Sequence, residues 1–98
     1  MNKNDNMVNN AEKAVKLLKV ISNRTRLMTL CLLKNKEYSV SELNEALGIA
    51  QSSLSQNLGV LREYGCVKTR REAQTIYYSL ESDEIKVLID TLYLLYCK

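Results

Sequence analysis

Two sets of side chains in this sequence could do chemistry: a run of short polar residues near the middle and three scattered cysteines. The polar run contains two glutamines, three serines and one asparagine, at Gln51, Ser52, Ser53, Ser55, Gln56 and Asn57. Glutamine and asparagine can bond bidentately to adenine, and serine can bond to a base or a phosphate. The cysteines are Cys31, Cys66 and Cys97. Their thiols could act as redox groups, as metal ligands or as small core residues.

The composition excludes several other kinds of chemistry. The chain has no histidine, and histidine is the most common metal ligand and general base. No nucleophile with a base and an orienting partner is found, so we expect no enzyme activity, no metal and no cofactor. No stretch approaches the roughly 18 apolar residues of a membrane span, and the polar start differs from a signal peptide. We therefore expect a cytoplasmic protein with reduced thiols.

The length of 98 residues predicts one domain over residues 1–98. A domain of this size buries only about 60 to 65% of the surface that its unfolded chain exposes, which favours pairing with a second copy. The net charge of +3 is too small to name a partner, but residues 1–34 carry +5 and residues 51–75 carry +2. These two segments could face phosphates.

Helical spacing of apolar residues predicts two helices in the first third of the chain. Residues 1–9 are polar and are predicted to be a mobile arm. The first helix is predicted from Asn10 to Ile21. Ser22 or Asn23 can cap the second helix, which is predicted to end near Lys34.

A helix-turn-helix pattern follows. Ser39 and Glu42 form a capping box that opens a short helix, and Gly48 ends it. A longer helix is predicted from Gln51 to Tyr64, with Gly65 as its C-terminal cap. A short helix, a tight turn with glycine and a second helix with a polar face are the parts of a helix-turn-helix motif.

The period of the pattern then changes from helical to two, which predicts a β-hairpin with strands at residues 67–72 and 75–80. Ser82 is predicted to cap a last helix that is apolar nearly all round, and such a helix must be covered, most simply by a second copy. The predicted fold is mainly α with a β-hairpin: a winged helix-turn-helix of four helices, two strands and a fifth helix, paired through its terminal helices.

The polar run lies at the start of the second helix of this motif, where base recognition takes place. Arg62 on the same helix and Arg70, Arg71, Gln74 and Thr75 on the hairpin could add contacts to the backbone or the minor groove. Taken alone, the polar run also fits an ordinary solvated surface, and the hairpin cations also fit the protection of a sheet edge.

The pattern resembles the ArsR/SmtB family of dimeric winged-helix transcriptional regulators over roughly nine tenths of the chain. The resemblance is carried by ISNRTRL at 21–27, VSEL at 40–43, QSSLSQNL at 51–58, LREYG at 61–65 and the hairpin ending in Tyr77 and Tyr78. Metal-sensing members carry Cys-Val-Cys where this chain has Ser39, Val40 and Ser41, or Asp and His ligands on the last helix. The resemblance therefore disfavours a metal sensor.

Residues 71–78, REAQTIYY, are similar to a narrower branch of that family, the HlyU, BigR and SqrR regulators. Members of this branch carry one cysteine on the second helix and one near the C-terminus, matched here by Cys31 and Cys97. The resemblance implies that an oxidant or a reactive sulfur species links these two sulfurs. Members of the wider ArsR/SmtB family often carry histidine at the position where this chain has Asn57.

The working hypothesis is a homodimeric repressor that binds a double-stranded DNA operator when reduced and releases it when Cys31 and Cys97 are linked. Three alternatives stay open. The protein could act as an activator that displaces another silencer without a redox switch, as a metal-responsive repressor that uses all three cysteines, or as a dimeric interaction module that binds no DNA.

Overall fold

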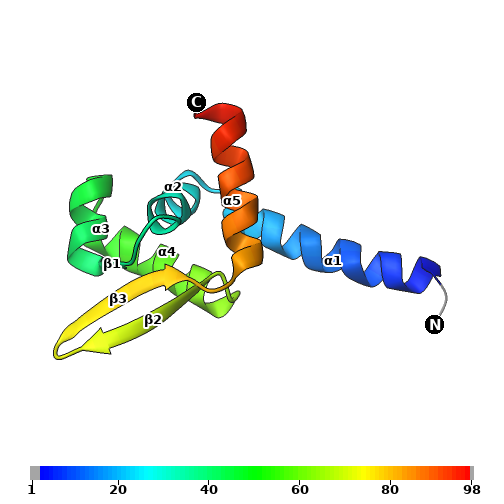
Figure 1. Cartoon of the computed structure of the whole chain (residues 1–98). Coiled ribbons are helices and arrows are strands. Elements are labelled where there is room, and N and C mark those ends of the chain that lie inside the picture. Colours follow the sequence, from blue (N-terminus) through cyan, green and yellow to red (C-terminus); the bar gives the residue numbers. More distant parts are fainter. Residues whose placement is uncertain (1–2, 98) are drawn as a thin grey trace.

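The computed structural model describes residues 3–97 (Figure 1). Its elements in chain order are α1 (Lys3–Ile21), α2 (Arg24–Leu33), β1 (Tyr38–Ser39), α3 (Val40–Leu47), α4 (Gln51–Glu63), β2 (Val67–Glu72), β3 (Thr75–Leu80) and α5 (Asp83–Tyr96). This order confirms the predicted winged helix-turn-helix, mainly helical with an antiparallel hairpin. Among these helices, none is both long enough and apolar enough to cross a membrane.

The helix α2 lies at the centre of the fold, where it contacts α1, α3, α4, α5 and β3. The core is formed by leucines and isoleucines that these elements turn inward, and its fully buried members include Leu30, Leu43, Leu54, Leu58, Leu61 and Ile89. Leu54, Leu58 and Leu61 recur at three- and four-residue spacing on one side of α4. The opposite side of α4 is therefore left to its polar residues.

The predicted helix caps are present. Asn23, not Ser22, caps α2: its side chain accepts a hydrogen bond from the Arg26 amide at 3.0 Å. Ser39 and Glu42 form the reciprocal capping box that opens α3, with bonds of 3.1 and 2.8 Å. Gly48 ends α3 in the left-handed conformation with φ 64°, a position that glycine adopts without steric strain.

Two predictions about secondary structure were wrong. The first helix begins at Lys3 rather than Asn10, so the segment predicted as an arm is helical from Lys3 onward. Neither glycine nor proline interrupts that segment, and adding a turn to an existing helix needs no new nucleation. The strand β1 was missed because two residues are too short for a period-two pattern, and Ser39 also serves as a cap.

The three strands form one antiparallel sheet in the order β1-β3-β2. Tyr38 pairs with Tyr78 across β1 and β3, and Val67 pairs with Leu80 across β2 and β3. The hairpin tip is at Ala73 and Gln74, as predicted, and Ala73 has a positive φ of 55°. Pairing with β1 ties the middle of β3 to the start of α3.

Two helices leave apolar surface uncovered. The helix α1 projects from the rest of the molecule (Figure 1) and exposes Met7, Val8, Val15 and Leu18, so most of its predicted apolar stripe lies outside the core. The helix α5 buries Ile85 and Ile89 but exposes five large apolar side chains, Val87, Tyr93, Leu94, Leu95 and Tyr96.

Candidate nucleic-acid interface and thiol pair

The first turns of α4 present the predicted polar residues on the outer face of the helix. Gln51, Ser52, Ser55 and Gln56 are exposed, and Ser53 is half-buried. The Asn44 amide donates to the Ile49 carbonyl and so fixes the turn that leads into α4. Ala50 stands at the N-cap and has no side chain that could bond the first backbone amides. Open amides at a helix start are suited to a phosphate.

Asn57 differs from its neighbours because other groups of the chain use its side chain. Its Oδ1 accepts a hydrogen bond from Arg26 Nη1 at 3.1 Å, and its Nδ2 donates to the Ser53 carbonyl at 2.9 Å. The side chain is half-buried. These bonds occupy the amide group that the sequence assigned to base contacts, so Asn57 holds α4 against α2.

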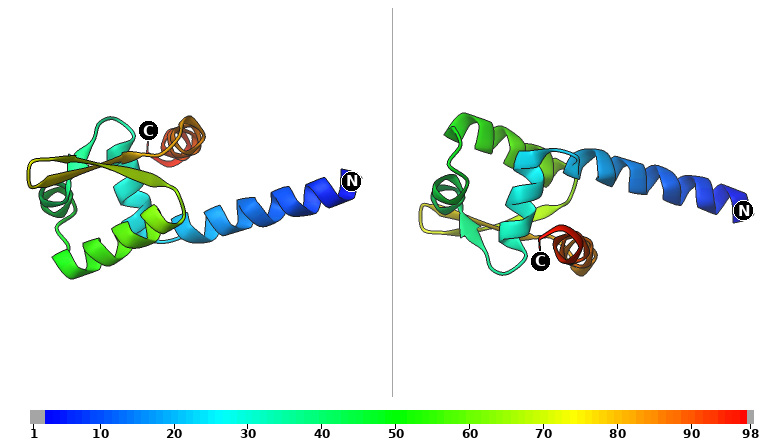
Figure 2. Two further views of the ribbon diagram at one scale, coloured as in Figure 1. Left: turned by 90° about the horizontal axis from the view of Figure 1, so that it is seen from below. Right: turned by 90° about the horizontal axis from the view of Figure 1, so that it is seen from above.

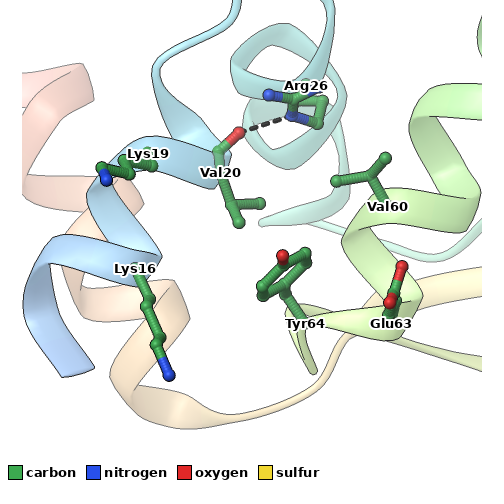
Figure 3. Close-up of a pocket in the computed structure, with 7 residues that line it drawn as sticks. All are labelled: Lys16, Lys19, Val20, Arg26, Val60, Glu63 and Tyr64. Carbon is green, nitrogen blue, oxygen red and sulfur yellow. Dashed lines mark hydrogen bonds between the residues drawn. The ribbon is translucent and has the colours of Figure 1, made fainter. Parts of the chain in front are cut away.

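Arg26 is a positioning residue that the sequence reasoning did not single out. Besides the bond to Asn57, its Nε donates to the Val20 carbonyl at the end of α1. Figure 3 shows this bond at the edge of a hollow that is also lined by Val60 of α4, by Tyr64 just after α4, and by Lys16 and Lys19 of α1 on the left. Arg26 thus joins α1, α2 and α4. Two features of the sequence could have pointed to Arg26. It belongs to the family segment 21–27, and it lies three positions after the helix cap Asn23.

The hairpin tip and the first turn of α4 project from the same side of the molecule, away from the free end of α1, in both views of Figure 2. At this tip Arg71, Gln74 and Thr75 are exposed, as a contact with DNA requires. Arg62 is also exposed, but it lies in the last turn of α4, about 16 Å along the axis from Gln51 at 1.5 Å per residue. It is therefore not part of the same cluster.

Arg70 is bound within the chain. Its Nε lies 3.2 Å from Glu37 Oε2, its Nη1 lies 3.1 Å from Glu72 Oε2, and its guanidinium stacks over the Tyr77 ring at 4.7 Å. The hydrogen bonds from Arg70 lower the pKa of the Glu37 carboxyl, and the two carboxylates raise the pKa of Arg70. Glu37 lies between α2 and β1, and through Arg70 it anchors the hairpin.

Cys31 of α2 and Cys97, the residue after α5, line one hollow of about 440 Å³. The rest of its lining is mostly apolar or aromatic: Leu27, Met28, Leu32, Tyr38, Ala46, Leu47 and Tyr93, with Lys34 and Asn35 at one side. Both thiols are free, Cys31 half-buried and Cys97 exposed. Burial raises the pKa of the Cys31 thiol, the neighbouring Cys97 raises it further, and Lys34 lowers it.

Cys66 is not among the residues that line this hollow. It is fully buried in the core beside Val67, and burial raises the pKa of its thiol. Within residues 3–97, no three His, Cys, Asp or Glu side chains come together as ligands for a metal ion. Cys66 therefore has the surroundings of a core residue.

Comparison with known proteins gives consistent matches. The family described as "Bacterial regulatory protein, arsR family" matches residues 23–69. The transcriptional activator HlyU of Vibrio cholerae is 50% identical over 92 residues, which are 94% of this chain and 85% of that protein. The biofilm growth-associated repressor of Xylella fastidiosa is 43% identical over 93 residues, 95% of this chain and 82% of that protein.

The fold agrees with a solved structure of the first of these relatives. Reduced HlyU from Vibrio cholerae superimposes with a TM-score of 0.91 and 49% sequence identity, over 95% of this chain and 98% of that chain. The match therefore extends beyond the helix-turn-helix to the terminal helices and the hairpin.

Proposed function

From the premise that this chain belongs to the ArsR family and is a DNA-binding transcriptional regulator of the HlyU and BigR type, we propose that it binds an operator as a homodimer and releases it when Cys31 and Cys97 become linked. The observation that carries the proposal is the shared hollow, which brings one thiol from α2 and one from the end of α5 together. No metal, cofactor or enzyme activity is part of it.

Operator recognition is assigned to the exposed polar residues of α4. Gln51 and Gln56 would read base edges, and Ser52, Ser53 and Ser55 would contact bases or phosphates. At the hairpin tip, Arg71, Gln74 and Thr75 would contact the DNA backbone next to the bases that α4 reads. Arg62, at the far end of α4, and Arg70, which is paired with Glu37 and Glu72, would contribute less to DNA binding. Asn57 would contribute by holding α4 against α2.

The homodimer is assigned to the terminal helices. Val15 and Leu18 of α1 and Val87, Leu94 and Leu95 of α5 are large apolar side chains that the single chain leaves exposed. Burying such surface against a second copy removes it from water. Two copies would then place their α4 helices in half-sites about 34 Å apart, one turn of DNA.

The link can form with either of two co-reactants. A peroxide is attacked by one thiolate: an S–O bond forms, the O–O bond breaks and hydroxide leaves. The second thiolate then attacks that sulfur, an S–S bond forms, the S–O bond breaks, and the oxygen leaves as hydroxide, which takes a proton from solvent to become water. A persulfide instead transfers its outer sulfur to one cysteine and leaves as a thiol, or as hydrosulfide if it is inorganic. Attack by the other thiolate on the inner sulfur then gives the disulfide and releases hydrosulfide.

The link would reach the DNA-binding face through α2. This helix carries both Cys31 and Arg26, and Arg26 bonds to Asn57 of α4. A link between α2 and α5 would therefore shift the element that holds α4. A bias of about 3 kcal/mol against the binding-competent arrangement lowers operator affinity more than a hundredfold.

The test is intact mass and operator binding in parallel, on protein that is reduced, treated with peroxide or treated with an inorganic persulfide donor. We expect both treatments to lower the mass by two hydrogens, as one S–S link requires, while affinity falls about a hundredfold. Cys31→Ser and Cys97→Ser abolish both changes, and Cys66→Ser is the matched control that keeps them. DNA binding that is indifferent to every treatment rejects the switch and keeps the operator assignment.

A second candidate is an activator that displaces another silencer by binding DNA, without a thiol switch. It is favoured by one observation: the 50% identical relative is named a transcriptional activator. Transcription from the operator-bearing promoter separates the two, since deleting the gene raises transcription under a repressor and lowers it under an activator.

A further inference from the structure

Lys34 occupies an unusual place for a lysine at the end of a helix. It follows the last residue of α2, yet its side chain is only 14% exposed. Its Nζ lies 3.4 Å from Asp90 Oδ1 and 4.2 Å from the centre of the Tyr93 ring, and both residues belong to α5. A cation held by a carboxylate and an aromatic face at once fixes two helices relative to each other.

These contacts lie next to the two thiols. Lys34 is three residues after Cys31 and lines the same hollow. Tyr93 is one turn before Cys97, and the Cys97 amide donates to the Tyr93 carbonyl at 2.8 Å. By holding Tyr93, Lys34 therefore holds the turn that carries Cys97 beside Cys31.

Lys34 also affects the charge state of Cys31. The thiol is half-buried, and its burial and the approach of Cys97 both raise its pKa, whereas Lys34 lowers it. The titratable groups that line the hollow or contact Lys34 are Cys31, Cys97, Lys34, Tyr38, Tyr93 and Asp90. Among them Lys34 is the cation, so it is the group that favours a thiolate over a thiol.

We propose that Lys34 is the positioning residue of the thiol pair: it holds α5 against α2 with Cys97 beside Cys31, and it stabilises the thiolate that forms the link. The inference rests on the proposed function, because it concerns the same two cysteines. It goes beyond it in naming the group that sets how fast they react.

The test compares Lys34→Met, Lys34→Arg and the control Lys86→Met, which removes a charge from an exposed position of α5 one turn before Asp90. The first readout is the pH dependence of Cys31 alkylation by iodoacetamide, measured in a Cys97→Ser background. We expect Lys34→Met to shift this profile to higher pH and so to slow alkylation at neutral pH, because the cation that lowers the pKa of the Cys31 thiol is gone. Lys34→Arg and Lys86→Met keep the wild-type profile.

The second readout is the rate at which peroxide links Cys31 and Cys97 in the otherwise wild-type protein. Lys34→Met should slow linking about tenfold or more. The variant loses the cation that stabilises the thiolate and the contacts that hold α5 against α2. Asp90→Asn keeps the ammonium and loosens α5, so linking slows while Cys31 alkylation does not. Circular dichroism and the melting temperature identify a variant that fails to fold, and Asp90→Asn then supplies the comparison with Lys86→Met.

The inference is overturned if Lys34→Met matches Lys86→Met in both readouts. Its failure is distinct from that of the proposed function. If linking proceeds and depends on Lys34 but leaves operator affinity unchanged, Lys34 keeps this role and the switch is rejected. If linking changes operator affinity and ignores Lys34, the switch stands and this role is rejected.

Discussion

The first turns of α4 and the hairpin β2–β3 project from the same side of the molecule, but the chain uses their polar groups differently. On α4 the amides of Gln51 and Gln56 are exposed to solvent. On the hairpin, Arg70 is bonded to Glu37 and Glu72 and stacked on Tyr77. The amides of α4 are free to bond a ligand. The hairpin, in contrast, uses the guanidinium of Arg70 to stabilise its own structure.

The difference separates two roles that a basic or polar residue can have at such a face. A base is read by groups whose hydrogen bonds are available and correctly held. On the hairpin, Arg70 is tied to Glu37, just before β1, so its charge is balanced within the chain and is not available to a phosphate. We therefore assign sequence specificity to α4 and a mainly sequence-independent contribution to the hairpin.

The largest effect should come from removing the open amides of α4. In Gln51→Ala with Gln56→Ala, a dimer loses four amide groups, and each bidentate base contact is worth about 1–3 kcal/mol of discrimination. Operator binding should fall to the level of non-specific DNA, with an unchanged melting temperature. Titration against operator and scrambled duplexes measures both; retained specificity would move recognition elsewhere.

A smaller loss, of a different kind, should follow from Asn57→Ala. It removes the side-chain bonds to Arg26 Nη1 and to the Ser53 carbonyl, so the free energy of unfolding should drop by about 1–2 kcal/mol. Operator affinity should fall with it, because α4 is less firmly held. Gln56→Ala is the matched control, with weaker binding and unchanged stability. Denaturant unfolding measures the stability of both variants. An unchanged midpoint in Asn57→Ala would contradict the positioning role of Asn57.

The sequence predicted well where the signal is local. The strand limits at 67–72 and 75–80 follow from period-two alternation and turn residues, and the structure reproduces them. The capping box at Ser39 and the stop at Gly48 also depend on residues a few positions apart. The outer face of α4 was predictable because Leu54, Leu58 and Leu61 fix the buried side.

The sequence failed where residues far apart meet. Arg70 and Glu37 are 33 positions apart, and Arg26 and Asn57 are 31 apart. No periodicity reveals such pairs, so Arg70 and Asn57 were assigned to DNA from their residue type and their place in the motif. The thiols of Cys31 and Cys97 were paired through the family resemblance, because spacing cannot show that α2 and the end of α5 meet at one hollow.

The next prediction concerns the two arginines of the hairpin. Arg71→Ala should weaken binding to all duplexes alike and reduce the slope of log affinity against log salt by about 1 per protomer. Arg70→Ala should have the smaller effect, because Arg70 is already paired. Affinity measured over a salt series tests this order. Equal slopes in the two variants would show that Arg70 leaves its carboxylates on DNA.

The Glu37→Gln variant tests the opposite change, in which Arg70 loses one of its carboxylate partners. The lowered pKa of Glu37 means that its ion pair with Arg70 is present above the ordinary value of 4.5 and is lost only as the pH falls through the still lower value in the folded protein. At neutral pH the pair is therefore intact. Removing it should raise DNA affinity a few-fold by freeing Arg70. In an Arg70→Ala background the gain should shrink, and an equal gain there would mean that only the lost negative charge matters.

The smallest effect is expected at the hairpin tip, where Ala73 has φ 55°. A left-handed conformation costs a residue with a Cβ roughly 1–2 kcal/mol, while glycine in the unfolded chain has about 0.5–1 kcal/mol more entropy to lose. Ala73→Gly should therefore stabilise the protein by about 0.5 kcal/mol. Because the backbone already has this shape, DNA affinity should not change. Thermal unfolding and operator titration check both, and a gain in affinity would mean that the tip changes shape when it meets DNA, unlike the rigid surface of α4.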